Sequence, residues 1–431
     1  MAPIRELQTT GIGPAPSFDV QFADRLNVLT GDNGLGKTLF LDLIWWGLTQ
    51  SWASQAALPS RGETATIKIT LGPITESITT SENEIASAEF NVEHQRWITE
   101  RKPVQTRGIA VYARTDGSMC VWDCYRNRAP EMEGLQAQFW GRHSDSRTPF
   151  FKLDENQLWN GSSSDRPWCN GLLRDWVNWQ FDQRPVKQSA FNILASLVTA
   201  LFPKGETPSI LPPKRLSIED SRDVPMLGFS YGPAPLIVLS AAMKRILELA
   251  YVLVWAWQEH IEAAATLGKP ASKEMVLLFD EVELHLHPRW QRYILPAVMK
   301  VAQKLDPDIR FQAVVSTHSP LVLSSIETHV NPDKDKLWHF FIDNRLVKLE
   351  ELDLRKRGNV VDWLDDVFGV QYPMSIEAQS AIEEAEAMML RRTKGSAISP
   401  VELEEIESEL KRTLPGNHEF WIRWLPSKDR P

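Results

Sequence analysis

The chain has 431 residues, of which 43% are hydrophobic and 24% charged, and its formal net charge is −9 at pH 7. These proportions are those of an ordinary globular protein with two or three domains. The acidic balance argues against a protein that coats nucleic acid through bulk charge, although a local basic groove could still contact DNA. The first residues lack the apolar core of a signal peptide, and the apolar runs are too short to cross a bilayer. We therefore expect a cytoplasmic protein with no membrane insertion.

The three cysteines, Cys120, Cys124 and Cys169, lack the paired spacing of zinc sites. They fit a reducing compartment and are assigned no chemistry. The seventeen tryptophans are most simply explained by packing in the core and at interfaces, because large aromatic side chains dominate buried contacts.

A phosphate-binding motif lies near the start of the chain. Two predicted strands, SFDVQFA and LNVLT, precede the sequence GDNGLGKT, and a predicted helix follows it. Residues 31–38 match the pattern G-x-x-x-x-G-K-[ST] at every defined position. In such a loop the glycines let backbone N–H groups face the phosphates, Lys37 reaches the β and γ oxygens, and the Thr38 hydroxyl binds Mg²⁺. The predicted ATP-binding residues are Gly31, Asp32, Asn33, Gly34, Leu35, Gly36, Lys37, Thr38 and Leu39.

The middle of the chain changes character twice. Short β-like runs from Ala65 to about Asp123 predict antiparallel structure beside the nucleotide core. Residues 130–235 are rich in loops and prolines, with one helical region from about Trp176 to Phe202, which suggests an inserted lobe or lid. The predicted division is 1–129 for the first part of the ATPase core, 130–235 for the lobe, 236–372 for the second part of the core, and 373–431 for a helical appendage.

Acidic side chains end a buried strand in the second half. A long helix is predicted from Ser240 to Gly268, followed by the strands MVLLFDE and FQAVVSTHS with a helix over 289–305 between them. Asp280 is expected to hold Mg²⁺, and Glu281 to accept the proton of an attacking water. The competing interpretation of Glu281 is a surface carboxylate in a salt bridge.

His318 follows the last of these strands, where ligands commonly sit in parallel sheets. It could contact the γ-phosphate of a nucleotide. The competing interpretation is an ordinary core or loop histidine.

The last 58 residues or so read as two charged helices. Ser399, Pro400 and Glu402 predict a capping box at the start of the second helix. Such an appendage is expected to pack on its own domain, and docking of a partner is the alternative.

Four segments together, GDNGLGKT, VLSAAMKR, VLLFDEVELHLHPRWQR and VVSTHSP, resemble the ABC-type ATPases, and more closely their SMC-like and OLD-like branch. The resemblance implies an α/β fold: a P-loop ATPase head with a mostly parallel central sheet, a flanking antiparallel sheet, an inserted helical lobe and a C-terminal helical appendage. It also implies that Lys37 and Thr38 bind the phosphates and Mg²⁺, Asp280 the Mg²⁺, Glu281 the hydrolytic water, and His318 the γ-phosphate.

The same resemblance implies a homodimer with ATP clamped between two heads, or a higher homo-oligomer. Ser240 and the start of its helix would face the nucleotide of the second subunit, and a helix N-terminus favours a phosphate there. Ala242 departs from the family, which usually has glycine at this position. The glutamine that senses Mg²⁺ in the family is not placed, with Gln157 and Gln180 as candidates.

The stretch His285-Leu-His287-Pro288 leaves two interpretations open. Two histidines at this spacing could bind a metal. A subunit-facing loop fixed by Pro288 is the favoured interpretation, because the sequence supplies no third ligand.

At the level of function, the chain resembles the ATPase subunits of bacterial anti-phage systems such as PARIS and Septu. This implies an ATP-hydrolysing switch that controls a separately encoded effector of nuclease or Toprim type, since the chain shows no such motif of its own. The alternatives are a RecF-like ATPase that acts on DNA directly, and a scaffold that binds ATP with negligible turnover.

Overall fold

The computed structural model describes residues 3–60, 64–73, 83–100, 108–127, 148–163, 167–182, 189–353, 357–394 and 399–428. Contacts divide the chain into two units, residues 1–358 and residues 359–431. The sequence placed the start of the appendage later, at residue 373. The described parts of the predicted lobe 130–235 belong to the first unit.

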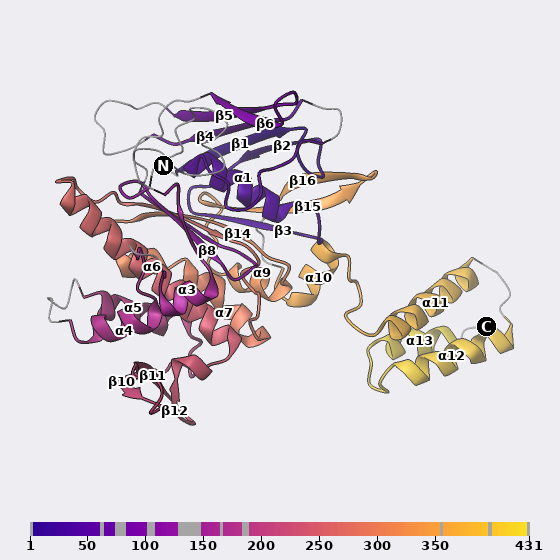
Figure 1. The fold of residues 1–431 in the computed structure, drawn as a ribbon. Coiled ribbons are helices and arrows are strands. Elements are labelled where there is room, and N and C mark those ends of the chain that lie inside the picture. Colours follow the sequence, from indigo (N-terminus) through magenta and orange to yellow (C-terminus); the bar gives the residue numbers. More distant parts are fainter. Residues whose placement is uncertain are drawn as a thin grey trace. The chain divides into compact units, whose positions relative to one another are not determined.

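An eight-stranded sheet forms the centre of the first unit (Figure 1). Its strand order is β16-β15-β3-β14-β13-β7-β8-β9, and the neighbours from β15 to β7 run parallel. The strands are β3 (Leu26–Gly31), β7 (Ile109–Ala113), β8 (Met119–Asp123), β9 (Phe151–Leu153), β13 (Glu274–Phe279), β14 (Arg310–Ser316), β15 (Asp335–Asp343) and β16 (Leu346–Leu352). Every residue of β3 and β13 is buried, as expected for strands covered on both faces.

An antiparallel sheet of five strands covers one side, with α1 (Lys37–Thr49) between the two sheets (Figure 1). Its strands are β1 (Ile4–Thr10), β2 (Ser17–Gln21), β4 (Thr66–Leu71), β5 (Glu84–Asn91) and β6 (Arg96–Glu100). Trp45 and Trp46 of α1 are fully buried in this core together with Phe40. The apolar helix that follows the phosphate loop is therefore fixed on both sides.

Helices cover the other side of the central sheet. They are α3 (Glu155–Asn160), α4 (Leu172–Gln180), α5 (Ala190–Leu201), α6 (Ala241–Thr266), α7 (Pro288–Val298), α8 (Val301–Leu305) and α9 (Pro320–Ile326). The longest, α6, packs against β7 and β8. Ser240 caps its first turn, and Gly268, with φ of 64°, lies just beyond its end.

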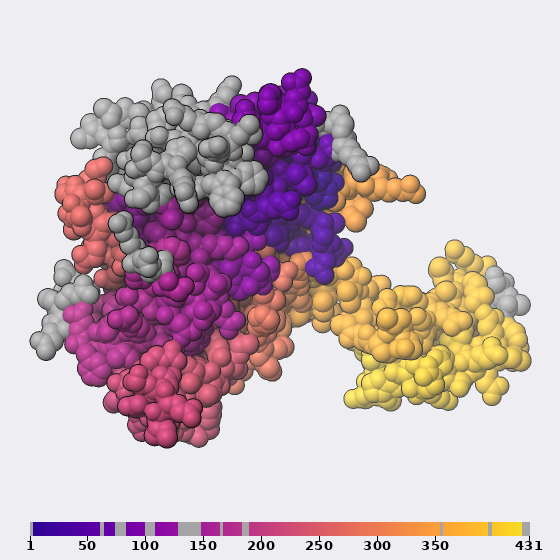
Figure 2. Space-filling model, viewed as in Figure 1, coloured from indigo at the N-terminus to yellow at the C-terminus, as the bar shows by residue number. Residues whose placement is uncertain are grey.

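A small three-stranded sheet bulges from one edge of the first unit, as Figure 2 shows in pink. Its strands are β10 (Ser209–Arg215), β11 (Asp223–Phe229) and β12 (Gly232–Pro235), and a short 3₁₀ turn, Leu236–Val238, joins it to α6. Several large apolar side chains near this sheet are exposed: Ile218, Tyr231, Ile237 and Val238.

The predicted α/β class is confirmed, with three local corrections. Residues 109–123 were expected in the flanking antiparallel sheet, but β7 is a parallel neighbour of β13 and carries β8 into the central sheet. The predicted helix over 289–305 is two helices, because Pro296 has no N–H to continue the ladder and α7 ends two residues later. Strand β1 was not predicted.

The second unit contains α10 (Val360–Phe368), α11 (Ile376–Thr393), α12 (Pro400–Thr413) and α13 (Phe420–Lys428). One apolar cluster holds the last three together and includes Ile382, Leu410 and Trp424. The sequence predicted two helices here, which correspond to α11 and α12, and missed α10 and α13.

The predicted capping box of α12 is wrong. The Ser399 side chain accepts a hydrogen bond from the N–H of Val401, two residues on, and Glu402 binds Arg391 of α11 instead of returning to the cap. Glu402 forms an ion pair with another helix in place of the predicted hydrogen bond to the backbone N–H of the cap residue.

Among the described residues, no helix combines the length and the apolar character that a membrane span requires.

We predict that Leu410→Ala destabilises the second unit by about 2–5 kcal/mol, because this fully buried leucine would leave a cavity between α11 and α12. Hydrogen exchange of peptides from residues 376–424 should quicken. The control is Val401→Ala on the exposed side of α12, which should leave exchange almost unchanged. Equal exchange in both variants would contradict the assigned core.

Candidate functional site

The C-terminal ends of three parallel strands meet at one edge of the central sheet. Strand β3 leads into the phosphate loop, β13 into Asp280 and Glu281, and β14 into Ser316, Thr317 and His318. The order β3-β14-β13 places them side by side. Ligands bind at this end of such sheets, and the structure brings the predicted residues together there.

The phosphate loop is shaped by glycines with positive φ. Gly31 has φ of 127°, and a Cβ at this position would lie 2.0 Å from the carbonyl oxygen of Phe340. Gly36 has φ of 99° and immediately precedes α1. Only glycine suits both demands, so the loop can hold its N–H groups in a concave arrangement that fits an anion.

Lys37 lies folded against its own loop. Its Nζ donates to the carbonyl oxygens of Gly31 at 2.9 Å and Asp32 at 2.7 Å. Burial lowers the pKa of the Lys37 ammonium to about 8, although the neighbouring carboxylates of Asp280 and Glu281 favour its charged form. The two carbonyl groups are neutral, so a negatively charged phosphate would form a stronger hydrogen bond with the Lys37 ammonium.

Asp280 joins the loop to the strands. Its Oδ2 accepts a hydrogen bond from the Thr38 hydroxyl at 2.8 Å, and its Oδ1 accepts one from the Ser316 hydroxyl at 2.6 Å. The side chain is almost completely buried. A hydroxyl and a carboxylate are hard oxygen donors of the kind Mg²⁺ prefers, so the residues fit the predicted ion.

Glu281 has an unusual backbone for a non-glycine residue, with φ of 49°. Its N–H donates to the Ser316 hydroxyl at 2.7 Å, which helps to hold this conformation. Burial and the adjacent charge of Asp280 raise the pKa of the Glu281 carboxyl, against the opposing effect of Lys37. A partly exposed carboxylate with a raised pKa is suited to accepting a proton.

His318 lies next to Glu281, with 4.0 Å between its Nε2 and Glu281 Oε1. Burial and the nearby positive charge of Lys37 lower the pKa of the imidazole, and the carbonyl of Gly31 opposes this shift. The neutral ring can therefore donate a hydrogen bond to a group bound at the phosphate loop.

Sequence reasoning missed the residues that hold His318 and Asp280 in place. Glu283 Oε1 accepts from the His318 N–H at 2.5 Å, and its Oε2 accepts from the Thr317 hydroxyl at 2.7 Å. Ser316 bonds to both Asp280 and the Glu281 backbone. Glu283 lies two residues after Glu281, and Ser316 lies two residues before His318. The spacing alone does not reveal these bonds, because the bonded residues follow different strands.

Two buried arginines connect this edge to the helices. Arg245 of α6 donates to the carbonyls of Gly117 at 2.9 Å and Arg114 at 2.7 Å, in the turn between β7 and β8. Arg114 in turn pairs with Asp42 of α1 at 2.9 Å. This chain of contacts ties α6 to the helix of the phosphate loop.

Ser240 lies apart from the cluster. It is exposed, its Oγ accepts from the Met243 N–H at 3.4 Å, and no contact among the described residues joins it to the phosphate loop. A role at a second subunit's nucleotide stays a prediction.

The glutamine candidates also lie elsewhere. Gln157 forms a capping box with Asp154 at the start of α3, and Gln180 donates to the carbonyl of Leu211. These bonds give neither glutamine a contact with the predicted nucleotide site.

His287 caps α7 by accepting from the Arg289 N–H, and His285 adopts φ of 63°. The described residues place neither histidine in a group of three metal ligands. The loop interpretation of this stretch is therefore favoured over the metal one.

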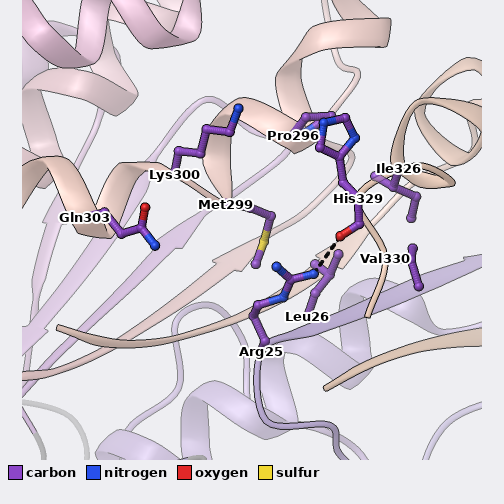
Figure 3. A pocket seen from close by; sticks show the side chains of 9 residues that line it. All are labelled: Arg25, Leu26, Pro296, Met299, Lys300, Gln303, Ile326, His329 and Val330. Atoms are coloured by element: carbon purple, nitrogen blue, oxygen red, sulfur yellow. Dashed lines mark hydrogen bonds between the residues drawn. The ribbon is translucent and has the colours of Figure 1, made fainter. Parts of the chain in front are cut away.

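A cavity of about 210 Å³ opens at the other end of β3 (Figure 3). Arg25, Met299, Lys300, Gln303 and His329 lie around it, and Arg25 donates to the His329 carbonyl. It borders Leu26, at the start of β3, about 15–20 Å along the strand from the phosphate loop. It is not part of the candidate nucleotide site.

Residues 181–324 match the family model described as "AAA domain, putative AbiEii toxin, Type IV TA system". Over 112 residues, 25% of the chain, the sequence is 31% identical to the "Retron Vc95 probable ATPase" of Vibrio cholerae serotype O1 biovar El Tor. Over 393 residues it is 21% identical to the Septu protein PtuA of Bacillus thuringiensis, covering 89% of each chain. The SMC head domain from Thermotoga maritima aligns with 82% of this chain and 100% of its own, at 17% identity and a TM-score of 0.40.

The matches confirm the predicted resemblance to ATPases of defence systems. The matched range 181–324 contains Asp280, Glu281 and His318 but not the phosphate loop. The alignment with the retron ATPase spans only 18% of that protein.

We predict that Lys37→Ala weakens ATP binding by a factor of about 100 or more, because it removes a charged donor worth about 1.5–3 kcal/mol for each phosphate hydrogen bond. Isothermal titration with a non-hydrolysable ATP analogue measures this. Lys204→Ala, on the exposed surface, is the matched control. Unchanged affinity in Lys37→Ala would remove the phosphate-loop assignment.

Ser316→Ala is expected to weaken Mg²⁺ binding in the presence of nucleotide by about 10–100-fold, because residues that orient a metal ligand have effects of this size. Nucleotide affinity without Mg²⁺ should stay the same. Ser324→Ala, whose hydroxyl donates to the Leu321 carbonyl, is the control. An unaltered Mg²⁺ dependence would show that Asp280 needs no support from Ser316.

Proposed function

We propose that this chain is an ATP-hydrolysing, oligomeric switch that controls a separately encoded effector in an anti-phage defence system. The observation that carries the proposal is the position of Asp280, whose two carboxylate oxygens accept from Thr38 of the phosphate loop and from Ser316 at the end of β14. This joins a phosphate-binding loop, a candidate metal ligand and a candidate base at one edge of the sheet.

In the proposed site, Lys37 leaves its two backbone carbonyls and binds the β and γ oxygens of ATP. The N–H groups of residues 31–36 and the start of α1 surround the phosphates. Thr38 and Asp280 would hold Mg²⁺, which, when bound, neutralises part of the phosphate charge. The chemistry of their oxygens supports this assignment.

Glu281 is the proposed general base. It accepts the proton of a water molecule as that water attacks the γ-phosphorus, and the bond to the β-bridging oxygen breaks to give ADP and phosphate. His318, 4.0 Å away, is placed to donate to the γ-phosphate, and Glu283 fixes its backbone. The raised pKa of Glu281 supports this role, because a better proton acceptor is needed than an ordinary surface carboxylate.

The proposed assembly is a homodimer closed by ATP, or a larger homo-oligomer. Ser240 and Ala241 at the start of α6 are exposed, and exposed Tyr231, Ile237 and Val238 lie close by in sequence. An open helix N-terminus beside apolar side chains suits contact with another subunit's phosphates. Ala242 keeps the backbone N–H that a glycine would offer to the phosphate, but its methyl group takes up space that a glycine would leave free.

The effector assignment rests on the relatives. The Septu protein aligns over nearly the whole of both chains, and the retron ATPase aligns with 112 residues of this chain. The effector would be a nuclease or Toprim-type protein encoded separately. A change of assembly on hydrolysis would change its activity.

The test measures phosphate release and the state of assembly together. The wild-type chain should release phosphate slowly, and Glu281→Gln should bind ATP, lose hydrolysis by about 100-fold or more, and accumulate as an ATP-bound oligomer. Light scattering after gel filtration, with and without ATP, reports the oligomer. Glu89→Gln, an exposed glutamate of β5, is the matched control. Full hydrolysis in Glu281→Gln would assign the base elsewhere.

Duplex DNA with free ends, added at low and at physiological salt, separates the switch from a RecF-like ATPase. A rate indifferent to DNA is expected of a switch that awaits its protein partner. A strong, salt-sensitive stimulation that is lost in Glu281→Gln would instead favour direct action on DNA.

A further inference from the structure

Three metal-ligating side chains gather at the opposite edge of the central sheet from the phosphate loop. Asp123 ends β8, opposite Ile109 at the start of β7, and Cys124 follows it. His260 comes from the last third of α6. One ligand atom from each of the three lies within 4.8 Å of the others.

The imidazole of His260 is held in one orientation. The ring is fully buried and stacks against Tyr125 at 4.9 Å and Trp257 at 5.7 Å. Its Nε2 lies 3.2 Å from the carbonyl oxygen of Ser272. A carbonyl only accepts, so Nε2 carries a proton and donates it there, as metal-bound histidines commonly do with their second nitrogen.

This leaves His260 Nδ1 facing the Asp123 carboxylate, with 3.2 Å between Nδ1 and Oδ1. In neutral imidazole, Nδ1 would then be an acceptor opposite another acceptor, so a positive charge is needed between the two. Asp123 Oδ1 already accepts from the Tyr125 N–H at 2.7 Å. Its Oδ2 is buried and has no hydrogen-bond partner among the described residues.

We propose that Asp123, Cys124 and His260 bind one transition-metal ion of the zinc type. The donors are a carboxylate oxygen, a thiolate sulfur and an imidazole nitrogen, which are the ligands that Zn²⁺ takes at about 2.0–2.3 Å. The ion would give His260 Nδ1 and Asp123 Oδ2 a positively charged partner. Cys124 is half-buried, so a water molecule can complete the coordination.

The rival explanation is a buried ion pair, in which an extra proton makes His260 an imidazolium beside Asp123. Stacked aromatic rings would also favour that cation. It leaves Oδ2 of Asp123 without a hydrogen-bond partner among the described residues, and it predicts no metal affinity.

The experiment uses Co²⁺ as a spectroscopic probe on the full chain, after removal of metals with a chelator and without nucleotide. The wild type should take up one Co²⁺ per chain with a sulfur-to-cobalt charge-transfer band, and Zn²⁺ should displace it. Cys124→Ser should lose the band, while Cys169→Ser, at a buried cysteine outside the cluster, should keep it. Asp280→Asn should keep it too, because the nucleotide site has no thiolate.

His260→Gln should lower the affinity for Co²⁺ at least 10-fold, and circular dichroism will confirm its fold. Zn²⁺ should raise the Tm of the wild type by a few degrees but not that of Cys124→Ser. No band at one equivalent of Co²⁺, or a band that survives in Cys124→Ser, would overturn the proposal. Neither result depends on ATP hydrolysis, so it is separate from the test of the switch.

Discussion

The candidate site depends on one buried carboxylate. Asp280 is almost fully buried, and each of its oxygens accepts a hydrogen bond from a different element, Thr38 at the start of α1 and Ser316 at the end of β14. Burial of an ionised carboxylate without hydrogen-bond donors would destabilise the fold by several kcal/mol. The strands and the phosphate loop must therefore be positioned so that Thr38 and Ser316 both reach Asp280. The unusual backbone of Glu281 follows from it, since Ser316 bonds to Asp280 and to the Glu281 N–H at once.

Hydrogen bonds and an ion pair connect this edge of the sheet to α6 and α1. The turn after β7 lies beside Asp280 and accepts hydrogen bonds from Arg245 of α6, while Arg114 from the same turn pairs with Asp42 of α1. Burial lowers the pKa of the Arg245 guanidinium, and the nearby carboxylate of Glu248 works against that shift. These contacts connect the helix of the phosphate loop to the first turns of α6. Under the proposed function, a change at the phosphate loop would reach Ser240 through them.

The sequence was sufficient to predict features that depend on residues close to one another in the chain. Each predicted feature is encoded within a few residues: the glycines and Lys37 of the phosphate loop, the apolar runs of β13 and β14, and the Ser240 cap.

The sequence was insufficient where residues far apart in the chain decide the structure. Strand β7 looks like its antiparallel neighbours, and only pairing with β13, far along the chain, makes it part of the central sheet. Glu402 fits a capping box by spacing, but Arg391 of another helix offers the stronger charge. Glu283 gives no sign of its two bonds to Thr317 and His318 until the loop is folded.

The same limit explains why Cys124 was assigned no chemistry. Metal sites are recognised in sequences by ligands close to one another, whereas His260 lies more than a hundred residues beyond Asp123 and Cys124 in the chain. It reaches them because α6 packs on β8. That helix begins at Ser240 and carries His260 about 30 Å further on, at 1.5 Å per residue. Arg245 near its start and His260 near its end bind opposite edges of the same pair of strands, β7 and β8. Under both proposals, an ion at the far end would fix the helix against the sheet. A nucleotide that acts through Arg245 would then move α6 and the two strands together and not the helix alone.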